Sequence, residues 1–321
     1  METIVWSDPL AAWLVSSHED VVAILKDPRF SAAQGRSPAP CGPDPAQTAI
    51  RRHVSSAIST NGEWIQDHMR TEANPLLAGL SNTSSFDLQS DLIQPWCENV
   101  ALRLIGQRPS TSGRRELVRA AWSVFRLTSG NPSNAPLADN ARSATTWLAT
   151  SLLETLDDAR THADQRLLSA LMKGEFTSGE LVAPCIQLFV SMCTSLPLLL
   201  GNILHHLLTS PENPPLPKRQ TCPHTIEEWL RLLGPAQYVY RIATTNVTVN
   251  GHSFHQGDRI GLALSTANRD PDRPLEARHL SLGMGHHACL GAPIVRWACA
   301  FFPAMIAERK PNLSLSSGVV R

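Results

Sequence analysis

A segment near the carboxyl end of the chain combines glycines, histidines and a cysteine at close spacing. In LSLGMGHHACLGAPIVR, residues 280–296, the positions of chemical or conformational interest are Gly283, Gly285, His287, Cys289 and Gly291. Glycine allows a backbone to lie flat against a bulky planar ligand. An apolar helix is predicted to begin near Cys289 and run to about Ala307, and a helix amino terminus favours thiolate over thiol. The segment therefore predicts a cysteine that binds a soft or borderline metal.

A second candidate for chemistry is the long apolar segment in the middle of the chain. Between Glu180 and Glu212 there is no formally charged residue, and 181–208 is long enough to span a bilayer. The segment nevertheless contains several polar or helix-disturbing residues: Gln187, Ser191, Thr194, Ser195, Pro197 and Asn202. It also lacks flanking basic and aromatic anchors. We therefore predict a buried central helix, kinked at Pro197 because proline removes a backbone donor.

The elements that must position these residues are mostly helices. Helical periodicity covers 45–59, 63–80, 91–106, 114–126, 141–158 and 178–208, and a short helix follows at IEEWLRLL. An earlier helix, SSHEDVVAILKD, has Ser17 as its predicted N-cap and ends at Pro28. Strand-like periodicity appears at 12–15, in YVYRIATTNVTVNGHSF and in RIGLALS, with a hairpin signal at Asn250-Gly251. The predicted fold class is mainly α with a minor β part.

Composition and charge favour one globular domain that acts on a small molecule. We predict a single domain over 1–321, with a helical body at about 45–233 and a minor β and cysteine-loop region at about 238–296. Lys plus Arg equals Asp plus Glu at 28 each, so no net charge attracts nucleic acid or an anionic membrane. The seven cysteines form no CxxC pair and the amino terminus has no signal-peptide pattern, which favours the cytoplasm.

The cysteine segment resembles the haem-binding loop of the cytochromes P450. The family pattern FGxGxHxCxG is matched at every fixed position except the first, where Leu282 stands in place of phenylalanine. Glu228 and Arg231 resemble the family's ExxR helix, although this spacing alone is typical of any solvated helical pair. Arg241 in YRIATTNVTVNG and ANRDP at 267–271 resemble the elements that follow. WLVSSHEDVVAILKDPRFSAA and DPAQTAIRRHVSSAIS extend the likeness over most of the chain.

The resemblance implies a P450-like fold with heme b (iron protoporphyrin IX) between the long central helix and the cysteine loop. Cys289 is the implied iron ligand, with Gly283 and Gly291 as loop glycines beside the cofactor. The implied propionate-binding side chains are Arg51, Arg241 and His287, with Gln47 in place of the family's usual histidine. A plain surface role is the alternative for Arg51 and His287. Glu228 and Arg231 are implied as a structural motif.

The central helix departs from the family where oxygen is activated. SMCTS aligns with the family's AGxxT motif, so Ser191 and Met192 replace alanine and glycine, and Thr194 replaces the acid. Thr194 and Ser195 are the expected catalytic positions, where the obvious proton donor is lost and a hydroxyl is kept. Val190, Ser191 and Met192 are expected in the substrate pocket. Met192 either crowds or ligates the iron there, or packs into the core.

Two classes of function follow from the resemblance. The leading hypothesis is a monooxygenase that hydroxylates, couples or cyclises a specialised metabolite, with electrons from a ferredoxin or a similar donor. The chain is short for the family near 128–138 and 209–224, which suits a bulky or carrier-bound substrate. The alternative is a haem protein without ordinary oxygen insertion, either peroxide-driven or an isomerase or cyclase. A non-catalytic partner-binding module is disfavoured by the intact Cys289.

Overall fold

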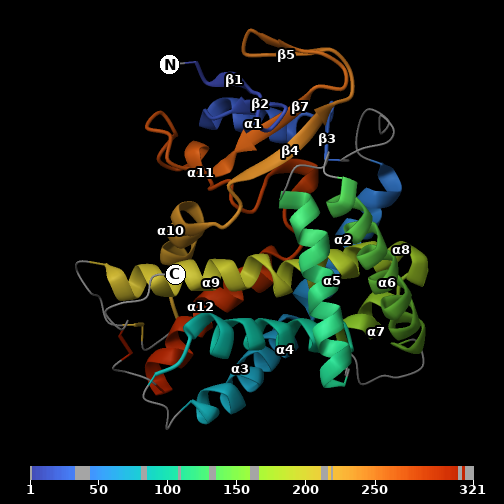
Figure 1. Cartoon of the computed structure of the whole chain (residues 1–321), viewed down its shortest axis with the longest axis vertical. Helices are drawn as coiled ribbons and strands as arrows, with labels where there is room; N and C mark the ends of the chain where they lie inside the picture. The colour runs from blue at the N-terminus through green and yellow to red at the C-terminus, as the bar shows by residue number, and fades with distance from the viewer. Residues whose placement is uncertain are drawn as a thin grey trace.

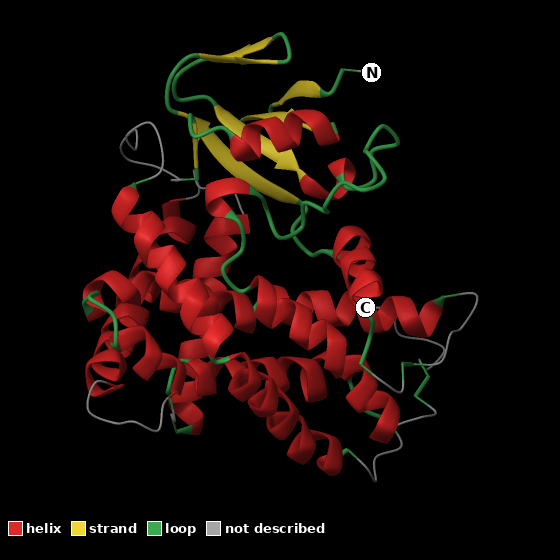
Figure 2. Ribbon diagram, turned by 180° about the vertical axis from the view of Figure 1, so that it is seen from behind, coloured by secondary structure: helices red, strands yellow, loops and turns green. Residues whose placement is uncertain are grey.

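The computed structural model places a helical body beside a small sheet region, which lies at one end of the molecule (Figures 1 and 2). It describes residues 2–32, 44–80, 85–107, 110–129, 135–159, 166–210, 216–217, 220–309 and 313–314. The described residues leave out 33–43 and much of the regions near 128–138 and 209–224 where the chain is short, together with the terminal segment after 314.

Ten helices make up the described part of the helical body. They are α2 (Pro45–Thr60), α3 (Gly62–Gly79), α4 (Gln94–Leu104), α5 (Thr111–Ser129), α6 (Ala135–Ala159), α7 (Arg166–Met172), α8 (Ser178–Cys193), α9 (Ser195–Thr209), α10 (Pro223–Leu233) and α12 (Ala292–Arg309). A π-helical segment, η1 (Leu88–Ile93), leads into α4. The predicted helical ranges are confirmed except at 178–208, with ends that differ by a turn or two. The short α7 was not predicted, because seven residues carry too little periodicity.

The strands form one mixed sheet and one separate hairpin. Across the sheet the order is β1 (Ile4–Ser7), β2 (Ala12–Val15), β7 (Arg259–Ala263), β4 (Tyr238–Ala243) and β3 (Phe30–Ser31). β2 and β7 pair in parallel, whereas the other neighbours are antiparallel. β5 (Val247–Val249) and β6 (His252–Phe254) form the hairpin, in which Asn250 and Gly251 have φ of 45° and 86°. This confirms the Asn-Gly turn, since both central residues need positive φ.

Two short helices flank the sheet. α1 (His18–Lys26) begins as predicted, with the Ser17 hydroxyl accepting a hydrogen bond from the amide of Asp20 at 3.1 Å. α11 (Leu264–Ala267) follows β7 directly, so the strand-like stretch RIGLALS ends in a helical turn. β1 was not predicted, because its four residues do not alternate clearly between apolar and polar.

The apolar central segment forms two helices instead of one. α8 ends at Cys193 and α9 begins at Ser195, and Thr194 between them has φ −127° and ψ −69°. Because Pro197 has no N–H, it cannot donate to the carbonyl of Cys193, and Gln94 Nε2 of α4 donates to that carbonyl instead, at 2.9 Å. The predicted disturbance is therefore confirmed, but the break lies nearly one turn before the proline.

This central segment is a core element. Among the described residues, Ser178–Thr209 is the one helical stretch long and apolar enough to cross a membrane, and 61% of its most apolar window is buried inside the protein. Such burial is typical of the core helix of a large globular protein.

Two apolar clusters hold the described structure together. The larger one lies among the helices and includes the fully buried Trp96, Phe189 and Phe302. The smaller one lies between α1 and the sheet, around residues such as Ile24 and Phe254. Each such side chain contributes about 1.5–3 kcal/mol by leaving water. The segment 280–290 joins the two clusters, because its first residue belongs to the smaller and its last to the larger.

Candidate functional site

Cys289 lies in a tight turn just before α12. Its amide donates to the carbonyl of Leu282 at 2.8 Å, and its own carbonyl accepts from the amide of Ala292 at 3.3 Å. A short 3-10 turn, η2 (Gly285–His287), fills the loop between these contacts. Because α12 begins at Ala292, the sulfur lies at the amino-terminal end of this helix, close to the predicted position.

Two glycines determine the space around this loop. Gly285 has φ 70°, and a Cβ built on it would lie 2.6 Å from the carbonyl oxygen of Leu25 in α1. A larger residue would therefore strain the backbone and push the loop away from α1. At Gly291 a Cβ would lie 3.9 Å from Cys289 Sγ and 3.5 Å from Leu188. The absence of a side chain there leaves space beside the sulfur.

A cavity separates the cysteine loop from the central helices. Its empty space is about 850 Å³, including the part open to solvent. Cys289, Leu290 and Gly291 line it from the loop. Ser191, Met192 and Ser195 line it from α8 and α9. The structure thus brings the predicted thiolate and three of the predicted central-helix residues to one space.

Two of the predicted central-helix residues do not line the cavity. The hydroxyl of Thr194 donates to the carbonyl of Val190 at 2.6 Å, and both side chains are buried in the helical core. Thr194 occupies the break between α8 and α9, so its side chain satisfies a carbonyl of the preceding turn. Ser195 therefore presents a hydroxyl to the cavity, whereas Thr194 does not. Met192, at 5% exposure, both packs in the core and lines the cavity.

Burial and charge have opposite effects on the Cys289 thiol. Burial raises its pKa, against a backbone hydrogen bond from Gly291 and the positive charges of Arg51 and Arg296, which lower it. The position of Cys289 at a helix terminus, taken alone, predicts a thiolate. In the folded chain, desolvation outweighs that effect, so the free thiol is favoured until a bound cation displaces the proton.

Three nitrogen-bearing side chains gather beside the loop without carboxylate partners in the described structure. Arg51 donates from Nη2 to the carbonyl of Ala288. Arg241 is 6% exposed, donates from Nη1 to its neighbour's carbonyl at 2.8 Å, and has an Nε without a partner. Burial, then the charges of Arg241, Arg51 and His286, lower the pKa of His287 to about 4. Gln47 lies one turn before Arg51 on α2, exposed to solvent.

These groups fit a haem. A buried guanidinium without a carboxylate is costly unless a ligand supplies the anion, and haem propionates are such anions. The described residues contain no group of three or more His, Cys, Asp or Glu side chains able to hold a metal ion. A porphyrin brings its own ligands to a metal that Cys289 binds.

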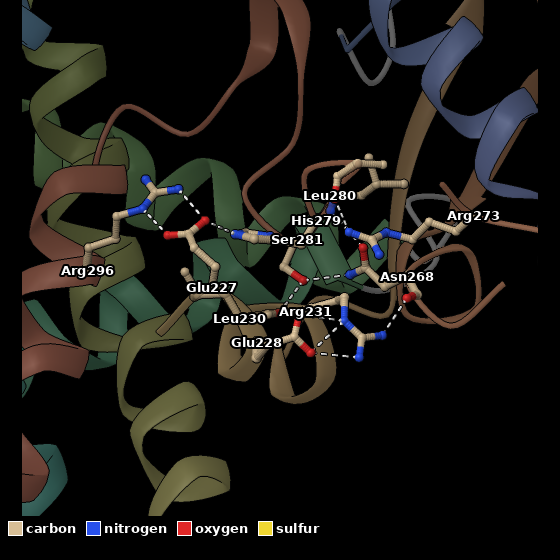
Figure 3. Close-up of polar contacts among 11 residues, drawn as sticks. Glu227, Glu228, Leu230, Arg231, Asn268, Arg273, His279, Leu280, Ser281 and Arg296 are labelled. Atoms are coloured by element: carbon tan, nitrogen blue, oxygen red, sulfur yellow. Dashed lines mark hydrogen bonds and ion pairs between the residues drawn. The ribbon is translucent and has the colours of Figure 1, made fainter. Parts of the chain in front are cut away.

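A polar network fixes α10 against the segments on either side of it (Figure 3). Arg231 pairs with Glu228 at 2.8 Å and donates to the carbonyl of Asn268 at 2.9 Å. The side chain of Asn268 in turn donates to Ser281 at 2.9 Å, just before the cysteine loop. The predicted ExxR pair is thus more than a solvated helical pair, because through Asn268 it connects α10 to Ser281 at the start of the cysteine segment.

A second part of this network was not predicted. Arg296 of α12 donates to both oxygens of Glu227 at 2.6 and 3.0 Å, and His279 Nε2 lies 3.1 Å from the same carboxylate. Figure 3 shows Arg296 and His279 on opposite sides of Glu227. The hydrogen bonds from Arg296 lower the pKa of Glu227, despite its partial burial. The network therefore joins α10, α12 and the start of the cysteine segment.

Comparison with known proteins agrees with this geometry. No protein-family profile matches the chain. The chain is 26% identical over 341 residues to the biotin biosynthesis cytochrome P450 of Bacillus subtilis, which covers 95% of the chain and 84% of that protein. It is also 26% identical over 355 residues to the mycinamicin VIII C21 methyl hydroxylase of Micromonospora griseorubida, which covers 97% of the chain and 86% of that protein.

Solved structures show the same relationship. The crystal structure of P450BioI in complex with an acyl carrier protein ligated to hexadec-9Z-enoic acid has a TM-score of 0.81 and 26% identity, covering 100% of this chain and 91% of that one. Cytochrome P450 CYP109B1 from Bacillus subtilis has a TM-score of 0.82 and 23% identity, covering 98% and 90%. The chain is therefore a homologue of the cytochromes P450, with the P450 fold and the haem cofactor of these oxidoreductases.

Proposed function

We propose that the chain is a monooxygenase that oxidises a small specialised metabolite, by hydroxylation or by oxidative coupling or cyclisation. The observation that carries this proposal is that Cys289 lines a cavity from one side while Ser191, Met192 and Ser195 line the same cavity from the other. A metal-binding sulfur and hydroxyl groups able to bind water or substrate thus border the same space.

The side chains beside the cysteine loop and those that line the cavity have separate roles. Arg51, Arg241 and His287 hold the haem propionates, and Cys289 binds the iron. When bound, the haem supplies oxygen activation, which a thiolate ligand promotes. Ser195 holds a water or a proton beside the reacting atoms. The apolar lining, which includes Leu196, Leu199 and Leu230, excludes bulk water.

The partners follow from the same proposal. Oxidation with molecular oxygen needs electrons, so a ferredoxin or a similar carrier supplies them in the cytoplasm. A carrier-bound substrate is supported by P450BioI, which is solved with an acyl carrier protein. A role in specialised metabolism is supported by relatives named for mycinamicin oxidation.

A spectrum and a turnover assay test this function. The purified holoprotein should give, after reduction and addition of carbon monoxide, the absorbance of a cysteine-ligated haem. Product formation from a candidate metabolite should then depend on both oxygen and an electron donor. A cysteine-ligated spectrum together with turnover that needs neither oxygen nor electrons would contradict the monooxygenase.

A second candidate function is favoured by the contacts of Thr194 and Met192. The Thr194 hydroxyl is occupied by the carbonyl of Val190, and a thioether lines the cavity where the family has glycine. The chain thus lacks an acid beside Ser195 to deliver protons during oxygen activation. These contacts suit a peroxide-driven enzyme, or an isomerase or cyclase that needs no such delivery.

Restoring the family residues distinguishes the two functions. Thr194→Asp combined with Met192→Gly should increase the fraction of consumed oxygen that appears as product, because an acid is added and space is opened. Met192→Gly is measured separately, since a carboxylate at the fully buried residue 194 carries a folding cost. Unchanged oxygen binding and coupling in both variants would remove the basis for the second candidate.

A further inference from the structure

A row of uncharged hydrogen-bonding side chains faces the cavity from the central helices. We propose that Gln187, Ser191 and Ser195 select a neutral substrate that carries hydroxyl, keto or amide groups along one edge of an apolar body. The inference rests on the proposed function and names the class of substrate that this cavity accepts.

The spacing of the row follows from the helices that carry it. The three residues are four positions apart, and all three line the cavity. Four residues rise by about 6 Å along a helix, so the polar groups of the ligand that meet Gln187 and Ser191 on α8 are expected at about that spacing. The rest of the lining from α8 and α9 is apolar: Leu188, Met192, Leu196 and Leu199. The row is therefore a polar stripe on an apolar wall.

The side chains of the row are available to a ligand, unlike nearby polar groups. The hydroxyl of Ser281, which also lines the cavity, already donates to the carbonyl of Leu230 at 2.5 Å. Gln94 is occupied by the carbonyl of Cys193 and by Glu98. Within the described part of the chain, by contrast, no hydrogen bond involves the side chains of Gln187, Ser191 or Ser195.

The cavity lining offers no charged side chain to pair with an ionised substrate. No Asp, Glu, Lys, Arg or His lies among the described residues that line this cavity, and Cys289 is its one ionisable group apart from any bound cofactor. A carboxylate placed here would gain no counter-charge from the lining. A glutamine amide and serine hydroxyls both donate and accept, which matches neutral oxygen and amide functions.

Binding of three twelve-carbon probes tests the inference on the haem-loaded protein. Cyclododecanone presents a neutral keto group, cyclododecane none, and dodecanoate a carboxylate. We expect cyclododecanone to bind at least about tenfold more tightly than dodecanoate at pH 8, because the carboxylate charge finds no counter-charge in the lining.

Gln187→Leu combined with Ser191→Ala should lower the affinity for cyclododecanone about three- to tenfold or more, as expected for one or two lost hydrogen bonds. Cyclododecane affinity should stay equal or rise. Equilibrium dialysis measures all three without turnover.

The controls separate this inference from the proposed function. Gln256→Leu makes the same substitution at an exposed turn between β6 and β7 and should change none of the affinities. Gln187→Asn keeps an amide and should recover part of the ketone affinity. Three results would each contradict the proposed selection by this row. Dodecanoate could bind as tightly as the ketone, or the parent protein could fail to bind the ketone. The variant could also lose affinity equally for the ketone and the hydrocarbon. Failure to form a cysteine-ligated haem at all overturns the proposed function instead.

Discussion

Cys289→Ser should abolish the cysteine-ligated haem spectrum and nearly all turnover while the fold persists. Serine is close in size, and the loop is held by backbone contacts from the amide and carbonyl of residue 289, which the substitution keeps. A hydroxyl is a far weaker ligand than a thiolate for this iron. The loss of activity should exceed the about 10- to 100-fold typical of residues that only support a metal ligand.

The matched control is another cysteine-to-serine change. Cys222 is exposed at the N-cap of α10, where serine is a favourable residue, so Cys222→Ser should leave spectrum and activity unchanged. The reduced carbon monoxide complex of Cys289→Ser should absorb at shorter wavelength than that of the parent protein. An unaltered spectrum in Cys289→Ser would place the iron on another ligand and remove the site described here.

Features set by neighbouring residues were predictable from the sequence. The Asn250-Gly251 hairpin, the Ser17 cap and the glycines of the cysteine loop depend on local backbone preferences. Most helices were also predictable, because their apolar periodicity extends over many residues. Resemblance to a known family then related Cys289 to a cofactor, which periodicity alone does not do.

Features set by distant contacts were not predictable. The carbonyl of Cys193 at the helix break is bonded by Gln94, a residue about 100 positions earlier in the chain. Glu227 meets Arg296 and His279 only after three segments pack together. The raised pKa of the Cys289 thiol likewise depends on burial by distant elements. Each of these features depends on tertiary packing, which local sequence patterns do not predict.

Arg241→Leu should have opposite effects on the haem-free and the haem-loaded protein. Burial lowers the pKa of Arg241 to about 10, so the fold disfavours its charge. At neutral pH the full free-energy cost of burying the charged guanidinium is present, because the pKa values of Arg241 in the folded and unfolded chain both lie above neutral pH. Leucine removes this buried charge, so the free energy of unfolding of the haem-free protein should stay equal or rise by about 1 kcal/mol or more.

The affinity for haem, by contrast, should fall in Arg241→Leu. If Arg241 pairs with a propionate, removing one partner of a buried pair costs about 3–5 kcal/mol, or about 100-fold or more in haem affinity. Denaturant unfolding of the haem-free protein and haem transfer to an acceptor globin measure the two quantities. Arg269→Leu, at a guanidinium that bonds to the backbone carbonyls of Ser265 and Leu232, controls for loss of an arginine elsewhere. Equal destabilisation of both forms would make Arg241 a structural residue, because only a cofactor partner separates the two effects.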